Sequence, residues 1–251
     1  MRQRVRKLIG ITLVLVVASV LPTVAGSRRF ADGDFATPEK AIEHFTESVK
    51  AGDAKGVIES FAVSRYAEKF DFDAATNRNE ALDQNTAFPS KFGFYRSFGE
   101  MRRAAVAATQ TQTFIASMVS TQRKVFVEST VALLRSKADV SKLAASLDPK
   151  RVKDLKLLAI LEVPIKSNTL YDKVKKTDKL IAKAEGADDA AEYLAFYQLD
   201  RETFMEGFLL FRYGKDWSLK QLSSPVANNP ANGAATRASA SEFAKAADPG
   251  S

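Results

Sequence analysis

The alternation of hydrophobic and polar residues from position 37 onward begins with a pair of helices. Ile42, Phe45 and Val49 recur at helical spacing, so the first helix has one apolar face. The Thr-Pro-Glu sequence at 37–39 supplies a capping hydroxyl, a first-turn proline and an acid at the positive end of the helix dipole. Gly52-Asp53 then suits the end of this helix and the cap of a second one.

The middle of the chain is predicted to be mainly helical. Residues 64–97 combine many phenylalanines with Pro89 and Gly93, which indicates loops and short helices that place aromatic rings in a core. From Phe98 to about Ser120 we expect one long amphipathic helix, with small residues in mid-stripe where another element can approach closely. Its stripe, with one polar break, is Phe98, Met101, Ala105, Ala108, Gln112, Ile115 and Val119.

Shorter elements follow this helix. The pattern of 124–134 leaves strand and helix undecided, whereas Asp139 and Asp148-Pro149 each suit the start of a short helix. Residues 157–163 form an apolar run before a proline and predict a buried strand. A lysine-rich helix is expected over 168–184.

The clearest strand signal lies near the C-terminal end. Residues 192–199, 203–213 and 217–222 are aromatic and β-rich and are separated by short polar turns, which predicts a three-stranded antiparallel meander. Apolar side chains occupy both faces of the first strand, so we expect it to be covered on both sides.

Two short blocks of the chain resemble NTF2-like domains. Thr37–Phe45 with Val49–Asp53 is similar to the helix pair that opens many exported bacterial members, and Phe208–Leu219 is similar to their closing hairpin. The resemblance implies helices in the concave side of a curved antiparallel sheet, around a cone-shaped cavity. The predicted fold is therefore α+β, an NTF2-like or cystatin-like cone with a helical insertion at about 64–190. The residues expected to be buried between helix pair and sheet are Ile42, Phe45, Ile58, Phe61, Phe196 and Phe208.

The first 26 residues have the order of a secretory signal peptide. Basic residues between Arg2 and Lys7 precede a 14-residue apolar run, Leu8–Leu21, and small residues follow before a cleavage point after Ala25 or Gly26. A spanning helix needs about 20 apolar residues, so the run is short, and an uncleaved anchor is the alternative. With no Cys to lipidate and no glycosylation sequon, the chain fits export in a bacterium, either to the periplasm or to the medium.

These signals divide the chain into four parts. Residues 1–26 are the signal, 27–35 a polar linker, and 36–223 a single α+β domain. Residues 224–251 form an Ala-rich tail with too few apolar side chains to offset the entropy of ordering, so this tail is expected to be disordered.

Composition and charge exclude several classes of function. The chain has 37 Lys+Arg, 30 Asp+Glu, one His and no Cys, which excludes disulfide scaffolds, thiol catalysis, Cys-ligated metals and multi-His sites. Without residues 1–26 the balance falls to 33 basic against 30 acidic residues, so no broad basic field is expected to attract nucleic acid. The small basic clusters 150–153 and 173–176 are expected to be solvated helix faces.

Three polar residues are candidates for acid–base chemistry. His44, the single imidazole, lies beside the apolar stripe of the first helix, and as a general base it needs an orienting carboxylate, for which Glu47 is one turn away. Asp71 and Asp73 flank a phenylalanine and are a candidate carboxylate pair. The alternatives are a histidine at a helix edge and a solvated loop.

Asp188, Asp189 and Glu192 are the candidate oxygen ligands for a calcium ion, and the alternative is a helix cap ahead of a strand. No phosphate loop, dinucleotide glycine pattern or Gly-x-Ser-x-Gly elbow occurs, so no cofactor is expected.

Two classes of function remain. The first is a non-catalytic envelope protein that binds a small apolar ligand or a protein partner through an aromatic-lined cavity. The second is a small isomerase or hydrolase that uses the same cavity. A membrane-tethered structural module is a third possibility and depends on an uncleaved signal, the expected route to any membrane contact. The scarcity of catalytic groups favours binding.

Overall fold

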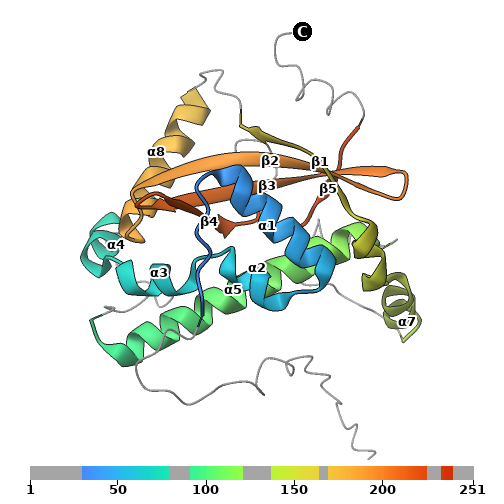
Figure 1. Ribbon diagram of the computed structural model, residues 1–251, viewed down its shortest axis with the longest axis horizontal. Helices are drawn as coiled ribbons and strands as arrows, with labels where there is room; N and C mark the ends of the chain where they lie inside the picture. The colour runs from blue at the N-terminus through green and yellow to red at the C-terminus, as the bar shows by residue number, and fades with distance from the viewer. Residues whose placement is uncertain (1–29, 80–90, 121–136, 164–168, 225–232, 240–251) are drawn as a thin grey trace, which may run out of the picture.

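The computed structural model describes residues 30–79, 91–120, 137–163, 169–224 and 233–239 (Figure 1). Its helices are α1 (Pro38–Ala51), α2 (Ala54–Glu59), α3 (Val63–Lys69), α4 (Phe72–Asn79), α5 (Gly93–Val119), α7 (Lys137–Ser146), the 3-10 helix η1 (Pro149–Asp154) and α8 (Thr169–Ala184). Its strands are β1 (Lys156–Glu162), β2 (Asp189–Leu199), β3 (Glu202–Tyr213), β4 (Asp216–Gln221) and β5 (Thr236–Arg237). The undecided segment 124–134 lies outside the described residues.

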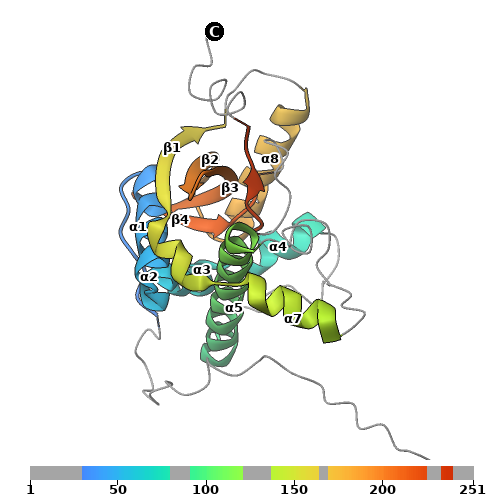
Figure 2. The ribbon, with the colours of Figure 1, turned by 90° about the vertical axis from the view of Figure 1, so that its right-hand side faces the viewer.

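The strands form one curved antiparallel sheet in the order β1-β2-β3-β4, with the short β5 paired to β3 (Figures 1 and 2). The longest ladder joins β2 to β3, from Asp189 opposite Arg212 to Leu199 opposite Glu202. Its turn holds Asp200 at φ 55°, and the next hairpin turn holds Gly214 at φ 68°. Asp tolerates this left-handed backbone and Gly adopts it freely. The predicted meander is confirmed, as is the α+β class with helices packed on a curved sheet.

The predicted capping of the helix pair is also confirmed. The Thr37 Oγ1 accepts a hydrogen bond from the Lys40 N–H at 3.3 Å, and Pro38 occupies the first turn of α1. Gly52 ends α1 at φ 69°. The Asp53 Oδ1 then accepts the N–H groups of Lys55 and Gly56 at 3.0 and 3.1 Å, which starts α2.

The main core lies between the concave face of the sheet and the helices α1, α2 and α5 (Figure 2). The Phe45 ring lies at its centre, with centroids 6.2 Å from Phe61, 5.6 Å from Phe114 and 5.9 Å from Phe208. These four rings are fully buried. The predicted packing of the helix pair against Phe208 is therefore confirmed. These aromatic rings, which were expected to line a cavity, pack around Phe45 instead.

Two of the residues expected in this core lie elsewhere. Ile58 is only partly buried at the edge of the core. Phe196 points to the convex face with Leu194 and Val163, because neighbouring residues of a strand alternate between faces. The expectation that both faces of β2 are covered is confirmed, since Tyr193, Ala195 and Tyr197 belong to the concave core.

The convex face is partly covered by α8, whose Ala182 and Ile181 pack against Leu209 and Phe211 of β3. The strand predicted over 157–163 is present as β1 up to Glu162, but most of it is not buried, because β1 is an edge strand with Leu158 exposed.

Residues 233–239 belong to the segment expected to be disordered, yet they pack on the domain. Ala234 and Ala235 are 1% exposed, and the Ala235 N–H donates to the Ser117 Oγ of α5 at 3.0 Å. β5 adds backbone hydrogen bonds to β3. Main-chain pairing and small side chains that fit a narrow gap hold this segment, which an estimate from apolar content alone does not capture. Among the described residues, no helix is both long enough and apolar enough to cross a bilayer.

Candidate functional site

The apolar stripe of α5 points away from the domain. Phe94 is 70% exposed, Phe98 53% and Met101 36%, and Ala105 and Gln112 are exposed as well. Ala108 and Ile115 are half-buried, and of the predicted stripe only Val119 is buried. The expected helix is present, and among the described residues no other element packs along its stripe. We define the outer stripe of α5 as Phe94, Phe98, Met101, Ala105, Ala108 and Gln112.

Polar residues of α5 set this orientation, because their hydrogen-bond partners lie on the side of the helix that faces the domain. Arg103 is buried and its Nη2 donates to the Leu219 carbonyl of β4 at 2.8 Å. The Gln110 Oε1 accepts the Leu222 N–H at 2.8 Å. Each hydrogen bond pairs a buried backbone group of the domain. An unpaired buried group of this kind would cost about 1–3 kcal/mol. Periodicity of apolar residues alone cannot detect such a polar inner face.

Gly99 allows α5 to approach α3 closely on the same inner face. A Cβ at Gly99 would lie 3.4 Å from the Ala67 Cβ of α3. The neighbouring Glu100 is buried and accepts a hydrogen bond from the Ser64 hydroxyl at 3.3 Å. Inner-face packing and a buried polar contact together fix the rotation of the first half of α5.

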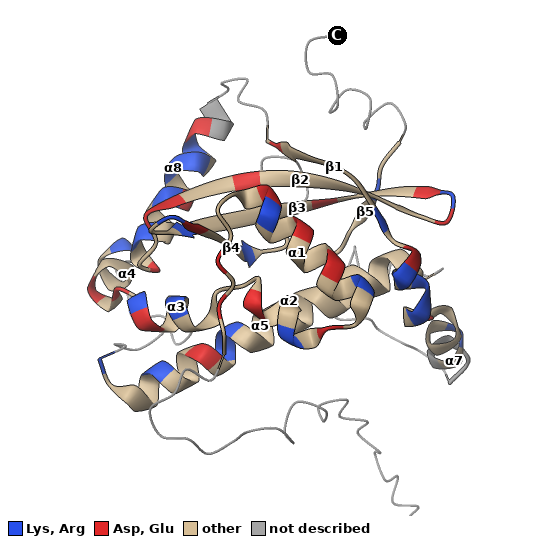
Figure 3. Cartoon of the chain, in the orientation of Figure 1, with Lys and Arg blue, Asp and Glu red and all other residues tan. Residues whose placement is uncertain are grey.

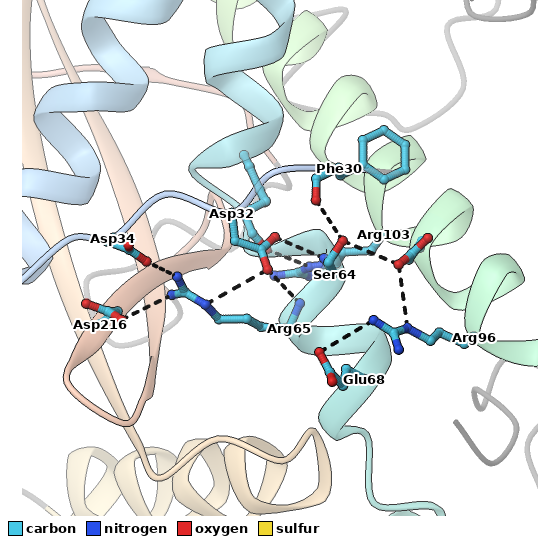
Figure 4. A network of polar contacts seen from close by, with 11 residues as sticks. Phe30, Asp32, Asp34, Ser64, Arg65, Glu68, Arg96, Arg103 and Asp216 are labelled. Atoms are coloured by element: carbon cyan, nitrogen blue, oxygen red, sulfur yellow. Dashed lines mark hydrogen bonds and ion pairs between the residues drawn. The ribbon is translucent and has the colours of Figure 1, made fainter. Parts of the chain in front are cut away.

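A polar network extends this attachment to the segment before α1 (Figure 4). The Asp32 carboxylate accepts the N–H groups of Ser64 and Arg65 at 3.0 and 2.8 Å and caps the start of α3. The Arg65 guanidinium in turn forms ion pairs with Asp34 and, at 3.7 Å, with Asp216. Residues of the predicted linker therefore hold α3 in place, and α3 holds α5.

The N-terminal end of the outer stripe carries a cluster of exposed aromatic rings. Phe94 lies 4.8 Å from Phe98 and 5.8 Å from Tyr95, and Tyr95 lies 5.9 Å from Phe92. Contacts between neighbouring rings restrict their side-chain rotamers, which lowers the entropy lost on binding.

Basic groups border this cluster. Lys91 places its ammonium 5.4 Å above the Phe92 ring. Arg96 is 3.4 Å from Glu68 and 3.8 Å from Glu100, and Arg102 is exposed beside Met101. The border therefore carries three basic side chains, while the acid nearest to solvent, Glu68, already has a partner.

His44 lies at the edge of α1, beside Phe35 and Glu59. Its side chain is 38% exposed and its ring lies 4.9 Å from that of Phe35. The carboxylate near it is Glu59, at 3.8 Å, and not Glu47, which pairs with Lys50 at 2.8 Å. The histidine at a helix edge is the arrangement found.

Asp71 and Asp73 do not form a pair in a cavity. The Asp71 Oδ1 accepts the Ala74 N–H at 2.8 Å and starts α4, while Asp73 is exposed in the first turn of that helix.

The three candidate calcium ligands also point to different partners. Asp188 accepts the Gly214 N–H at 2.6 Å, and Asp189 lies 3.2 Å from Lys179 and 3.7 Å from Arg212. Glu192 accepts a hydrogen bond from the Ser224 hydroxyl. Within the described residues, no three His, Cys, Asp or Glu side chains lie close enough together to hold a metal ion.

Sequence reasoning missed two buried carboxyl groups. Asp178 of α8 contacts Glu192 of β2, and burial together with the Glu192 charge raises the pKa of Asp178 to about 8. Burial also raises the pKa of Glu206 well above its ordinary value, although the Gly207 N–H opposes the rise. Neither Glu206 oxygen meets hydrogen-bond geometry with any described group. Glu206 alternates with Phe204 and Phe208 on the concave face, a position that strand periodicity could have identified.

One solved structure has the same arrangement of helices and sheet. A cystatin-like protein from Ruminococcus gnavus superposes with a TM-score of 0.52, over 91% of this chain and 48% of that one, at 17% sequence identity. The fold is cystatin-like. The chain spans about half the length of that protein, and the likeness extends to the fold alone. Cystatin-like and NTF2-like folds are related cone-shaped α+β folds, so the resemblance in the sequence holds at that level. No family model and no curated protein matches the chain.

Proposed function

We propose that this chain is an exported, non-catalytic binding protein whose outer stripe on α5 receives a helical segment of a partner protein. The observation that carries the proposal is the outward orientation of the apolar stripe on a helix whose inner face is fixed by polar contacts. Export rests on the signal-like order of residues 1–26.

The composition of the stripe supports a protein as the occupant. Aromatic residues, Met and Arg are enriched at protein interfaces, and a few such anchors carry most of the binding energy. Phe94, Phe98 and Met101 are such anchors, while Ala105 and Ala108 leave room for close approach of a second backbone. An apolar helix face fits this order of large and small residues.

The charge at the border specifies the partner further. Arg96 already pairs with Glu68 and Glu100, and the positive charge of Lys91 and Arg102 favours a helix with acidic residues along its flanks. The same charge disfavours a second copy of this chain, because antiparallel pairing of two α5 helices near Met101 brings Arg102 close to its own equivalent.

The structure gives less support to the other functions considered. The rings of Phe61, Phe114 and Phe208 pack around that of Phe45, so these aromatic residues serve as core. An isomerase or hydrolase needs converging polar groups, yet the half-exposed His44 lies near Glu59, and Glu206 is fully buried.

A photoreactive residue at Ala105 tests the proposal in producing cells. We expect one discrete adduct heavier than the chain, lost when Phe98→Asp is added. Photoreactive Ala51, exposed at the end of α1, is the matched control and should give no such adduct. Absence of an adduct at Ala105, or one of twice the mass of the chain, would overturn the proposal of a partner protein.

A further inference from the structure

A second surface, on α8, combines positive charge with one apolar side chain. Lys173, Lys176, Leu180 and Lys183 follow one another at spacings of three, four and three residues, so they form one stripe along the helix. All four are exposed, and Leu180 is 49% exposed. The opposite side of α8, including Asp178 and Ala182, is buried against the sheet. The orientation of this lysine stripe is therefore set by the fold.

Little of this charge is neutralised nearby. Lys179 pairs with Asp189 at 3.2 Å. Lys173, Lys176 and Lys183 form no ion pair with any residue that the structure describes. Lys173 and Lys176, three residues apart, repel one another along the helix, so an anionic partner relieves a repulsion already present in the free protein.

The stripe borders an open hollow of about 470 Å³. We call the residues that line it, together with Lys173, the α8 lysine face. The lining residues are Asp172, Lys175, Lys176, Lys179, Leu180 and Lys183. Asp172 is the one acid among them, so the hollow favours anionic groups.

The α8 lysine face is separate from the outer stripe of α5. Figure 3 shows the blue lysine positions on α8 at the upper edge of the molecule, with α5 at the lower edge. Figure 2, turned by 90°, keeps the same separation. Occupation of one surface leaves the other accessible.

We propose that the α8 lysine face binds the anionic phospholipid headgroups of a bilayer surface. Lysine ammonium groups are attracted to anionic leaflets, and an apolar side chain among them enters the boundary between headgroups and acyl chains. Leu180 supplies that side chain, a feature that nucleic acid or a flexible acidic peptide does not require. A chain carrying an export signal also meets a membrane on its route. This contact is additional to the one that an uncleaved signal would provide.

Vesicle co-sedimentation tests the proposal with the protein as isolated from producing cells. We expect binding to phosphatidylcholine vesicles that contain phosphatidylglycerol, weak binding to phosphatidylcholine alone, and a loss of binding as salt rises. Loss of one lysine near the surface weakens binding about fivefold, so Lys176→Glu with Lys183→Glu should weaken it by well over tenfold. Leu180→Ser should weaken it with all charges retained. Circular dichroism verifies that the variants are folded.

The matched control is Lys150→Glu with Lys153→Glu, which makes the same charge change on the exposed lysines of η1. This variant should retain vesicle binding. Equal loss in both variants would show that net charge alone matters, and absence of binding to phosphatidylglycerol vesicles would also overturn the proposal.

Two further experiments distinguish a bilayer from free phosphate and from a soluble acidic polymer as the bound anion. Inorganic phosphate alone should fail to protect the protein against heat, and a soluble acidic polymer should not replace the vesicles. Protection by phosphate, or binding to the polymer that depends on Lys176 and Lys183, would replace the bilayer as the occupant. Phe98→Asp should leave vesicle binding unchanged, so the outcome is independent of the proposal for α5.

Discussion

Arg103 of α5 donates a hydrogen bond to the backbone carbonyl of Leu219 in β4, and this contact sets which side of α5 faces the sheet. The guanidinium also lies 5.3 Å from the Tyr66 ring and 5.7 Å from the Phe61 ring. A charged group thus occupies an inner position that an apolar residue usually takes. The apolar stripe faces outward as a consequence.

Truncation of two phenylalanines of α5 should have very different effects on stability. Phe114→Ala should lower the free energy of unfolding by about 3–5 kcal/mol, because this ring is fully buried against Phe45 and Tyr197. Phe98→Ala should change it by less than about 1 kcal/mol, because the ring is exposed. Denaturant titration measures both, and a similar loss in the two variants would show that the outer stripe belongs to the core.

Stability should fall as pH rises between the pKa of Asp178 in the unfolded chain and its higher pKa in the folded protein. In this range Asp178 keeps its proton in the folded protein and loses it in the unfolded chain. The folded state raises the pKa of this carboxyl from 3.8 to about 8. Its stabilising contribution is therefore complete below the unfolded pKa and is lost as pH rises toward the folded one. Between about pH 5 and 8 the thermal midpoint of Asp178→Asn should fall less than that of the wild type.

The control for this pH dependence is Asp73→Asn, which removes an exposed carboxyl group. Its thermal midpoint should follow the wild-type pH profile. If Asp178→Asn also follows the wild-type profile, the contact between Asp178 and Glu192 does not hold a proton.

Replacement of Glu206 should stabilise the protein. Glu206→Leu removes a fully buried carboxyl group without a hydrogen-bond partner among the described residues, so we expect a gain of about 1–3 kcal/mol in the free energy of unfolding. A clear loss of stability would instead indicate that the carboxyl group has a polar partner in the folded protein.

The first 25 or 26 residues should be absent from the exported protein. N-terminal sequencing of the envelope fraction should give a chain that begins at Gly26 or Ser27, after cleavage behind Ala25 or Gly26. A chain that still begins at Met1 and stays in the membrane would support the anchor.

Local signals in the sequence predicted most of the elements. Thr37, Gly52 and Asp53 end or begin helices through bonds with their own neighbours, so their roles are visible in sequence. Strict alternation divided the residues of β2 into two faces, but it did not show which face is concave, and Phe196 was expected on the wrong one. The capping and alternation rules need no knowledge of what packs against the element.

The orientation of α5 and the places of β1 and β5 could not be predicted in the same way. Arg103 and Gln110 are buried only because each finds a hydrogen-bond partner far away in the sequence. The Leu219 carbonyl accepts from Arg103, and the Leu222 N–H donates to Gln110. β1 is an edge strand because nothing pairs with its outer side among the described residues. The raised pKa of Asp178 beside Glu192 likewise requires two elements to meet.

The central claim is that the outer stripe of α5 is a docking surface for a partner helix. It is tested most directly by calorimetry with the partner identified through the Ala105 adduct, on the wild type, Ala105→Trp and Ala51→Trp. Both alanines are exposed, so both variants should fold, and only Ala105→Trp fills the middle of the stripe. We predict wild-type affinity for Ala51→Trp and a loss of at least about 100-fold for Ala105→Trp, which corresponds to about 2.7 kcal/mol. Equal affinity in all three proteins would contradict the claim.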